Sequence, residues 1–297
     1  MAESLAFMNG SLVPQSEASL AFNDAGFVFG ATVTDLCRTF RHRLYRWHDH
    51  LARFRESCHA MAVHPPFTDE TITVQAHELV QCNTKLIDTN QDLALVLFAT
   101  PGPIGYYLGG SVDVEVCPTL GMHTFPLPFA RYRPWIQEGV SLITPKVRQI
   151  PGASIPLHTK HRSRLHYWLA GQEVGTNHQA LLLDLTEHVT ETASANFLIV
   201  KDGTVISPPL DSILPGVSLK VVTELCDRLG IPLVHRPISL EDCYQADEAL
   251  LTCTTYSLAC VRGINGQVLT RFEPVFRRLV EAWSAEVGVN IHEQFLG

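Results

Sequence analysis

The chain has few charged residues and no long apolar run. Only 18% of its 297 residues are charged, and acidic residues outnumber Lys and Arg by 30 to 22, which gives a formal net charge of −8. Proteins that bind nucleic acid or an anionic membrane surface usually carry a basic face. No stretch approaches the roughly 18 consecutive apolar residues that cross a membrane. We therefore expect neither nucleic acid nor membrane as a partner.

Closely paired cysteines are absent as well. The eight cysteines form no C-x-x-C pair, and His48 and His50 have no further ligands nearby at zinc spacing. Disulfide frameworks and zinc sites require such spacings. The N-terminus carries no basic segment followed by an apolar core, as a secretory signal would. The sequence predicts no metal, no disulfide framework and a reduced, cytoplasmic location.

Lysine is scarce, with only five residues in the chain, at positions 85, 146, 160, 201 and 220. Lys160 stands in a basic run, H-T-K-H-R-S-R, just before a segment from Leu165 whose apolar spacing predicts a helix. It is either one more member of a cationic patch or a nucleophile, because a neutral lysine amine attacks carbonyl groups. Lys201 and Lys220 have other contexts, a hairpin turn and a helix respectively.

The stretch from Glu191 to Lys220 contains the densest pattern in the chain. An acidic residue is followed by a strand-like run, by the turn Asp202-Gly203 and by a second strand, and then comes L-P-G-V-S at the start of a predicted helix, Val217–Leu229. A glycine-containing turn that opens a helix leaves free N–H groups at the positive end of the helix dipole. Taken alone, the pattern fits either an ordinary hairpin and helix of an α/β core or an anion site with phosphate as the occupant.

The order of these motifs resembles the signature of class IV (fold type IV) pyridoxal-phosphate enzymes. The matching elements are E-x-x-x-x-N-F, a hairpin, S-P-P and L-P-G-V-S-x-K, and the likeness extends from Asp24 to Gly266. The family includes branched-chain and D-amino acid aminotransferases and 4-amino-4-deoxychorismate lyases. The resemblance implies a two-domain α+β fold and a homodimer with pyridoxal 5'-phosphate at a domain interface.

The same resemblance sets the expected domain boundaries. Residues 1–125 would form a small N-terminal α/β sandwich, and residues 136–297 a larger, cofactor-binding pseudo-barrel domain. Residues 126–135 contain three prolines and would form the interdomain loop.

Site residues follow from the resemblance residue by residue. Lys160 would hold the cofactor through a Schiff base and move the α-proton, while Glu191 would keep the pyridine nitrogen protonated. The remaining cofactor-binding positions are Arg53, Asn196, Val217, Ser218 and Thr254, with Arg53, Thr254 and the helix amides at the phosphate.

The substrate is less well specified by the sequence. Leu165 stands where branched-chain members carry a tyrosine, and Ala99-Thr100-Pro101-Gly102 replaces the V-T-R-G loop of D-amino acid members. Three arginines are candidate carboxylate contacts or surface charges: Arg38, Arg162 and Arg164.

Three functions remain open at this stage. The leading one is an aminotransferase acting on an amino acid and a 2-oxo acid. The alternatives are a 4-amino-4-deoxychorismate lyase that releases pyruvate and a catalytically silent protein that only binds pyridoxal phosphate.

Overall fold

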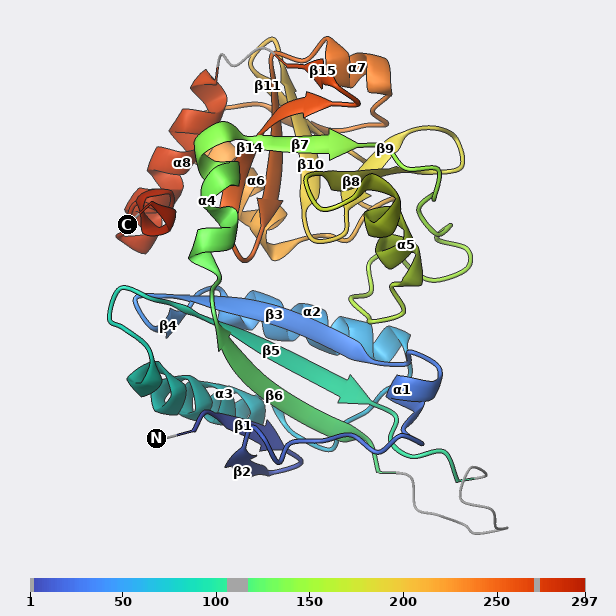
Figure 1. Cartoon of the computed structure of the whole chain (residues 1–297), viewed down its shortest axis with the longest axis vertical. Helices are drawn as coiled ribbons and strands as arrows, with labels where there is room; N and C mark the ends of the chain where they lie inside the picture. Colours follow the sequence, from blue (N-terminus) through green and yellow to red (C-terminus); the bar gives the residue numbers. More distant parts are fainter. Residues whose placement is uncertain (1–2, 106–116, 270–272, 297) are drawn as a thin grey trace. The chain divides into compact units, whose positions relative to one another are not determined.

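The structure of the protein, a computed structural model, describes residues 3–105, 117–269 and 273–296. Contacts divide the chain into two compact units: unit 1 comprises residues 1–127 and 159–163, and unit 2 comprises residues 128–158 and 164–297 (Figure 1). None of the described helices is long and apolar enough to cross a membrane.

Unit 1 is built on a six-stranded sheet in which every pairing is antiparallel. Its strands, in the order β2-β1-β6-β5-β3-β4 across the sheet, are β1 Leu5–Met8, β2 Ser11–Pro14, β3 Val33–Phe40, β4 Arg43–Leu44, β5 Leu93–Thr100 and β6 Thr119–Pro126. A turn at Asn9-Gly10 joins β1 to β2, and Asn9 has the positive φ of 48° that such a turn requires.

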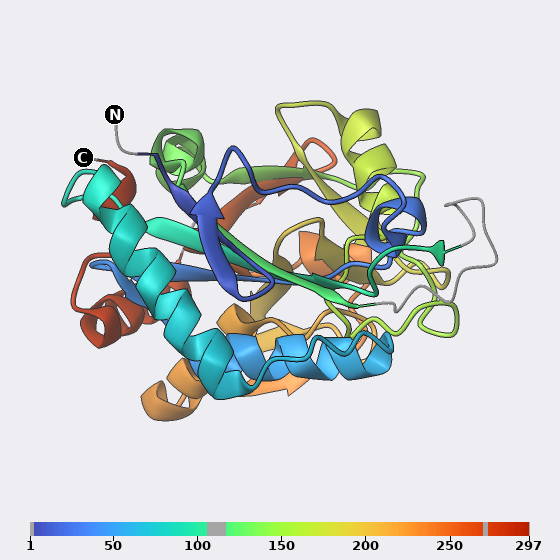
Figure 2. The same cartoon turned by 90° about the horizontal axis from the view of Figure 1, so that it is seen from below.

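Helices α2 Trp47–Ala60 and α3 Asp69–Asn83 cover one face of this sheet, as Figure 2 shows from below. The other described helical segments of unit 1 are the short α1 Ala25–Val28 and the 3₁₀ turn η1 Thr84–Leu86. Alternate strand residues such as Val33 and Cys37 on β3 and Leu95 and Leu97 on β5 pack with α2 and α3 in one core. Side chains alternate between faces along a strand, so Asp35 lies on the same helix-covered face as Val33 and Cys37.

Unit 2 contains a nine-stranded sheet whose middle strands close on themselves. The strands are β7 Val140–Ile143, β8 Gln179–Leu183, β9 Val189–Thr192, β10 Asn196–Lys201, β11 Thr204–Ser207, β12 Leu233–His235, β13 Glu248–Cys253, β14 Ser257–Ile264 and β15 Gln267–Val268. Eight strands follow the order β12-β11-β10-β13-β14-β7-β8-β9, and β15 pairs with β14 outside this path. Strand β9 also pairs with β10 through Glu191 and Asn196. This second pairing closes a ring from β10 through β13, β14, β7, β8 and β9, which is the predicted pseudo-barrel.

Helices surround the strands of unit 2, and several of them match the sequence-based expectations. They are α4 Phe129–Glu138, α5 Leu165–Val174, α6 Val217–Leu229, α7 Leu240–Tyr244, α8 Pro274–Val287 and the 3₁₀ turn η3 Glu293–Phe295. The predicted bounds of α6 are confirmed, because Gly216 precedes its first turn and Gly230, with a φ of 64°, ends it. Mixed helix and strand in both units fits the expected α+β class.

Two segments differ from the sequence-based expectations. Residues 126–135 are largely helical rather than a loop, because β6 ends at Pro126 and α4 begins at Phe129. Aromatic contacts hold α4 in place: the Phe129 and Phe295 ring centroids are 4.9 Å apart. The segment 159–163, expected within the second domain, lies with unit 1 instead.

Candidate functional site

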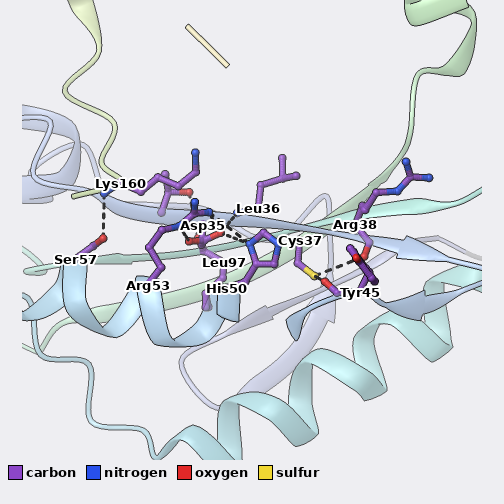
Figure 3. A network of polar contacts seen from close by, with 11 residues as sticks. Asp35, Leu36, Cys37, Arg38, Tyr45, His50, Arg53, Ser57, Leu97 and Lys160 are labelled. Carbon is purple, nitrogen blue, oxygen red and sulfur yellow. Dashed lines mark hydrogen bonds and ion pairs between the residues drawn. The ribbon is translucent and has the colours of Figure 1, made fainter. Parts of the chain in front are cut away.

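Lys160 is anchored to unit 1 through its backbone. Its N–H donates to Ser57 Oγ on α2 at 3.0 Å, and its carbonyl accepts from the N–H of Thr34 on β3 at 2.9 Å. Val33 and His161 form an isolated antiparallel bridge beside these bonds. The side chain is half-buried, and Figure 3 shows its amine pointing away from α2. A backbone fixed on two sides restricts the position from which this amine can act.

Asp35 organises a buried charge cluster next to Lys160. Its carboxylate is 2% exposed and accepts from Arg53 Nε at 2.9 Å, from Arg53 Nη2 at 2.8 Å and from the N–H of Leu36 at 2.7 Å. His50 Nδ1 lies 2.8 Å from Asp35 Oδ1. In Figure 3, Arg53 and His50 both point from α2 toward Asp35 on β3.

The pKa values of Asp35 and His50 in this cluster are both lowered. Burial raises the pKa of Asp35, but the charge of Arg53 and the hydrogen bonds from Arg53 and His50 outweigh it and hold that pKa well below its usual range. Burial lowers the pKa of His50, and Arg53 and Lys160 lower it further, against the opposing effect of Asp35. Asp35 is therefore ionised and His50 neutral at pH 7, so the firm ion pair of this cluster is that of Asp35 with Arg53.

Sequence reasoning assigned Arg53 to the cofactor phosphate, and the structure places it in the bidentate pair with Asp35. Two of its nitrogens are engaged there, and its phosphate role stays a prediction. Arg38, a candidate substrate contact, is 1% exposed, lies 3.7 Å from Asp92 and stacks on the Phe40 ring at 3.8 Å. These contacts are what a structural arginine of unit 1 makes, and its substrate role is untested. Arg162 is exposed, with its guanidinium 5.6 Å from the centre of the Phe98 ring.

In unit 2, Glu191 is held at the point where the strand ring closes. It is 7% exposed, and its Oε1 accepts from Tyr167 Oη at 2.9 Å and from the N–H of Leu214 at 3.2 Å. Its Oε2 accepts from Asn196 Nδ2 at 3.0 Å. Three donors favour the charged carboxylate over the neutral acid. Glu191 can therefore support a positive charge on a bound group.

The predicted phosphate turn lies beside this carboxylate. Asn196 Nδ2 also donates to the Leu214 carbonyl at 2.8 Å, and a Cβ added to Gly216 would lie 2.2 Å from Asn196 Oδ1. Gly216 is the N-cap of α6 and has no side-chain cap bond. The N–H groups of the first turn, which include those of Val217 and Ser218, are the ones that a helix N-terminus offers to an anion.

The strand register places Thr254 at the same end of unit 2. Asn196 on β10 pairs in register with Thr252 on β13, and Thr254 follows in the turn directly after that strand. The structure thus brings together Glu191, Asn196, the start of α6 and Thr254, which stand up to about sixty residues apart in the sequence. Their individual roles stay predictions.

Sequence reasoning missed Tyr167 and Gln149. Tyr167 Oη donates to Glu191, and Gln149 Nε2 donates to Tyr167 Oη at 2.8 Å. Arg164, predicted as a substrate contact, lies over the Tyr167 ring at 4.8 Å and donates to the Ala193 carbonyl. A tyrosine in the first turn of the helix after Lys160 was the available signal.

Comparison with known proteins decides the family. The profile described as "Amino-transferase class IV" matches residues 32–264. The chain belongs to the class IV aminotransferase family. It is an enzyme of that class, as predicted, and the match includes every predicted site residue in both units.

Relatives in this family cover nearly the whole chain. A Methanocaldococcus jannaschii protein named as a candidate branched-chain-amino-acid aminotransferase is 28% identical over 89% of this chain and 88% of its own. The D-alanine aminotransferase of Staphylococcus aureus strain N315 is 26% identical over 93% of this chain and 95% of its own. The crystal structure of the branched-chain aminotransferase of the archaeon Thermoproteus uzoniensis with norvaline has a TM-score of 0.84 and is 24% identical, covering 99% of this chain and 98% of that one. The fold prediction, a two-domain α+β fold of type IV with a pseudo-barrel, is confirmed.

Proposed function

We propose that this aminotransferase uses pyridoxal 5'-phosphate, held by Lys160, to move an amino group between an amino acid and a 2-oxo acid. The observation that carries the proposal is the buried Glu191 carboxylate, which has three hydrogen-bond donors and lies beside the N-terminus of α6. A carboxylate and an anion site in one cluster are the two features that a phosphorylated pyridine requires. The relatives are named as aminotransferases, which favours transfer over the lyase and over a silent binding protein.

The donor chemistry of both units fits this cofactor. Unit 2 offers a carboxylate for a ring nitrogen, and the N–H groups of a helix start with no side-chain cap for a phosphate. Unit 1 offers Lys160, whose backbone is anchored on two sides. Pyridoxal phosphate, when bound, supplies an aldehyde for an amine and a ring that withdraws electrons from the substrate α-carbon.

Each residue then has a defined task. The Lys160 amine would hold the cofactor, and it would take a proton from the substrate α-carbon and return one as general base and acid. Glu191 keeps a proton on the ring nitrogen, and Asn196 orients Glu191. For the phosphate, the donors in the proposal are the N–H groups of Val217 and Ser218, the Thr254 hydroxyl and the Arg53 guanidinium.

The finer substrate assignment is also part of the proposal. We expect an α-amino acid and its 2-oxo acid, because one relative is named for branched-chain amino acids and another for D-alanine. Arg162 and Arg164 are the proposed contacts for a substrate carboxylate, with Arg38 as the buried third candidate. A homodimer in the cytoplasm completes the proposal.

The visible absorption spectrum of the purified protein, loaded with pyridoxal phosphate, tests this function. The wild type should show a band of the lysine-bound cofactor, which Lys160→Ala should abolish and Lys85→Ala should retain. Lys85 is the matched control because it is an exposed lysine in the same unit. L- and D-amino acids are then added singly, followed by a 2-oxo acid.

Loss of the band on adding one stereochemical series, with recovery on adding the 2-oxo acid, would support amino transfer and settle the chirality. A band that no amino acid moves would contradict transfer. A wild-type spectrum identical to that of Lys160→Ala would overturn the role of Lys160.

A further inference from the structure

Tyr167 connects two polar groups of unit 2 in a fixed direction. Gln149 Oε1 accepts from the N–H of Ile150 at 2.9 Å, so its amide nitrogen must face Tyr167, 2.8 Å away. An amide nitrogen only donates. The single proton of the Tyr167 hydroxyl is therefore left for Glu191 Oε1, at 2.9 Å.

The surroundings of Tyr167 keep this donor in its protonated form. Burial raises the pKa of Tyr167 well above its ordinary value, and the negative charge of Glu191 raises it further, while Gln149 and Arg164 act in the opposite direction. Arg164 lies over the ring at 4.8 Å. The Tyr167 hydroxyl is thus a neutral donor at neutral pH.

We propose that Tyr167 is a positioning residue that keeps Glu191 ionised and aimed at the cofactor ring nitrogen, with Gln149 fixing the direction of its hydrogen bond. This inference rests on the proposed function. Tyr167 Oη and the backbone N–H of Leu214 both donate to Glu191 Oε1, whereas Asn196 donates to the other oxygen. Tyr167 consequently influences how readily the carboxylate takes up a proton.

The chemical consequence of losing the hydroxyl can be stated with its sign. Without Tyr167 Oη, the ionised carboxylate loses a donor and accepts a proton from the ring nitrogen more readily. An unprotonated ring withdraws less electron density from the nitrogen through which Lys160 would hold the cofactor. The pKa that governs the visible absorption band of the Lys160-bound cofactor therefore rises, and removal of the proton from the substrate α-carbon becomes slower.

The test is a pH titration of the visible band in cofactor-loaded wild type, Tyr167→Phe and the control Tyr244→Phe. Tyr244 is a half-buried tyrosine of the same unit, whose hydroxyl accepts from Asn265 Nδ2 at 3.2 Å. We expect the pKa of the transition to rise by about one pKa unit in Tyr167→Phe, the order that one hydrogen bond to a carboxylate produces. The kcat should fall about tenfold with KM nearly constant, and Tyr244→Phe should match the wild type in both.

Gln149→Leu is the second variant, and it tests the role of Tyr167 if Tyr167→Phe does not fold. It leaves Tyr167 in place but releases its hydroxyl, so the pKa should shift in the same direction by a smaller amount. An unshifted pKa in a folded, cofactor-loaded Tyr167→Phe, or in Gln149→Leu where the first does not fold, would overturn the inference. A wild type without any Lys160-dependent band would instead overturn the proposed function, so the two failures are distinguishable.

Discussion

Replacing Asp35 on β3 with Asn should destabilise unit 1 far more than breaking an exposed ion pair that α2 makes through Arg55. Asp35 is 2% exposed and binds both Arg53 Nε and Arg53 Nη2. Asn preserves the size of the side chain but removes its charge, so the 8% exposed Arg53 loses its carboxylate partner. Removing one member of a buried ion pair costs about 3–5 kcal/mol. The expected fall in the free energy of unfolding is of that order.

Asp69→Asn is the matched control. Arg55 and Asp69 form an ion pair at 2.6 Å, but the Asp69 side chain is 64% exposed. An exposed ion pair contributes about 1 kcal/mol or less. Both arginines lie on α2, so the comparison isolates burial.

Urea unfolding at pH 7, followed by tryptophan fluorescence, measures both effects, since the buried Trp47 on α2 reports on unit 1. A double variant, Asp35→Leu with Arg53→Met, should recover much of the loss, because apolar replacements of buried ion pairs are well tolerated. If Asp35→Asn lowered the unfolding free energy no more than Asp69→Asn, the reasoning from burial would be refuted.

Two further predictions concern pH and the anion site. Burial lowers the pKa of His50, His123 and His292 in the folded protein. As the pH falls below the ordinary histidine pKa of about 6.5, these side chains therefore take up protons in the unfolded chain before they do so in the folded protein. The free energy of unfolding should therefore fall from pH 7 to pH 5, by at most about 1.4 kcal/mol per pH unit for each histidine. Urea midpoints measured across that range should change less with pH in His292→Gln than in the wild type. An equal dependence on pH in both would contradict a contribution from His292. Gly216→Ala should raise the dissociation constant of pyridoxal phosphate about tenfold or more, because the new Cβ would lie 2.2 Å from Asn196 Oδ1. The control Gly171→Ala should leave the dissociation constant unchanged, since its Cβ would have no neighbouring atom within 4 Å. Fluorescence titration of the cofactor-free protein with pyridoxal phosphate measures both constants.

Local signals in the sequence were sufficient to predict several elements of the fold. The bounds of α6 follow from Gly216 and Gly230 at its ends and from the apolar spacing between them. Expectation failed for residues 126–135, where prolines predict a loop. Pro134 lies inside α4 and cannot donate a helical hydrogen bond. Contacts of α4 with Tyr256 and Phe295, over a hundred residues away, outweigh this cost, and no local pattern contains them.

The candidate site was predictable in its motifs but not in its partners. Glu191 and the α6 turn lie within one stretch, so their order could be recognised along the sequence. The pairing of Asp35 with Arg53 depends on how α2 packs across β3. The bond from Tyr167 to Glu191 likewise depends on α5 folding back to the ring of strands. Such contacts are set by tertiary packing, which spacing alone does not encode.

The buried carboxylates of Asp35 and Glu191 should therefore respond differently to mutation. Asp35 is compensated by the full charge of Arg53, so losing either partner leaves a buried charge and mainly affects stability. Glu191 accepts from neutral donors, including Tyr167 and Asn196, and deleting one of them removes a hydrogen bond worth about 1.5–3 kcal/mol to a charged group. Because the bound cofactor would share the Glu191 carboxylate, that loss should affect catalysis before it affects folding. Tyr167→Phe should thus remain folded under conditions in which Asp35→Asn begins to unfold.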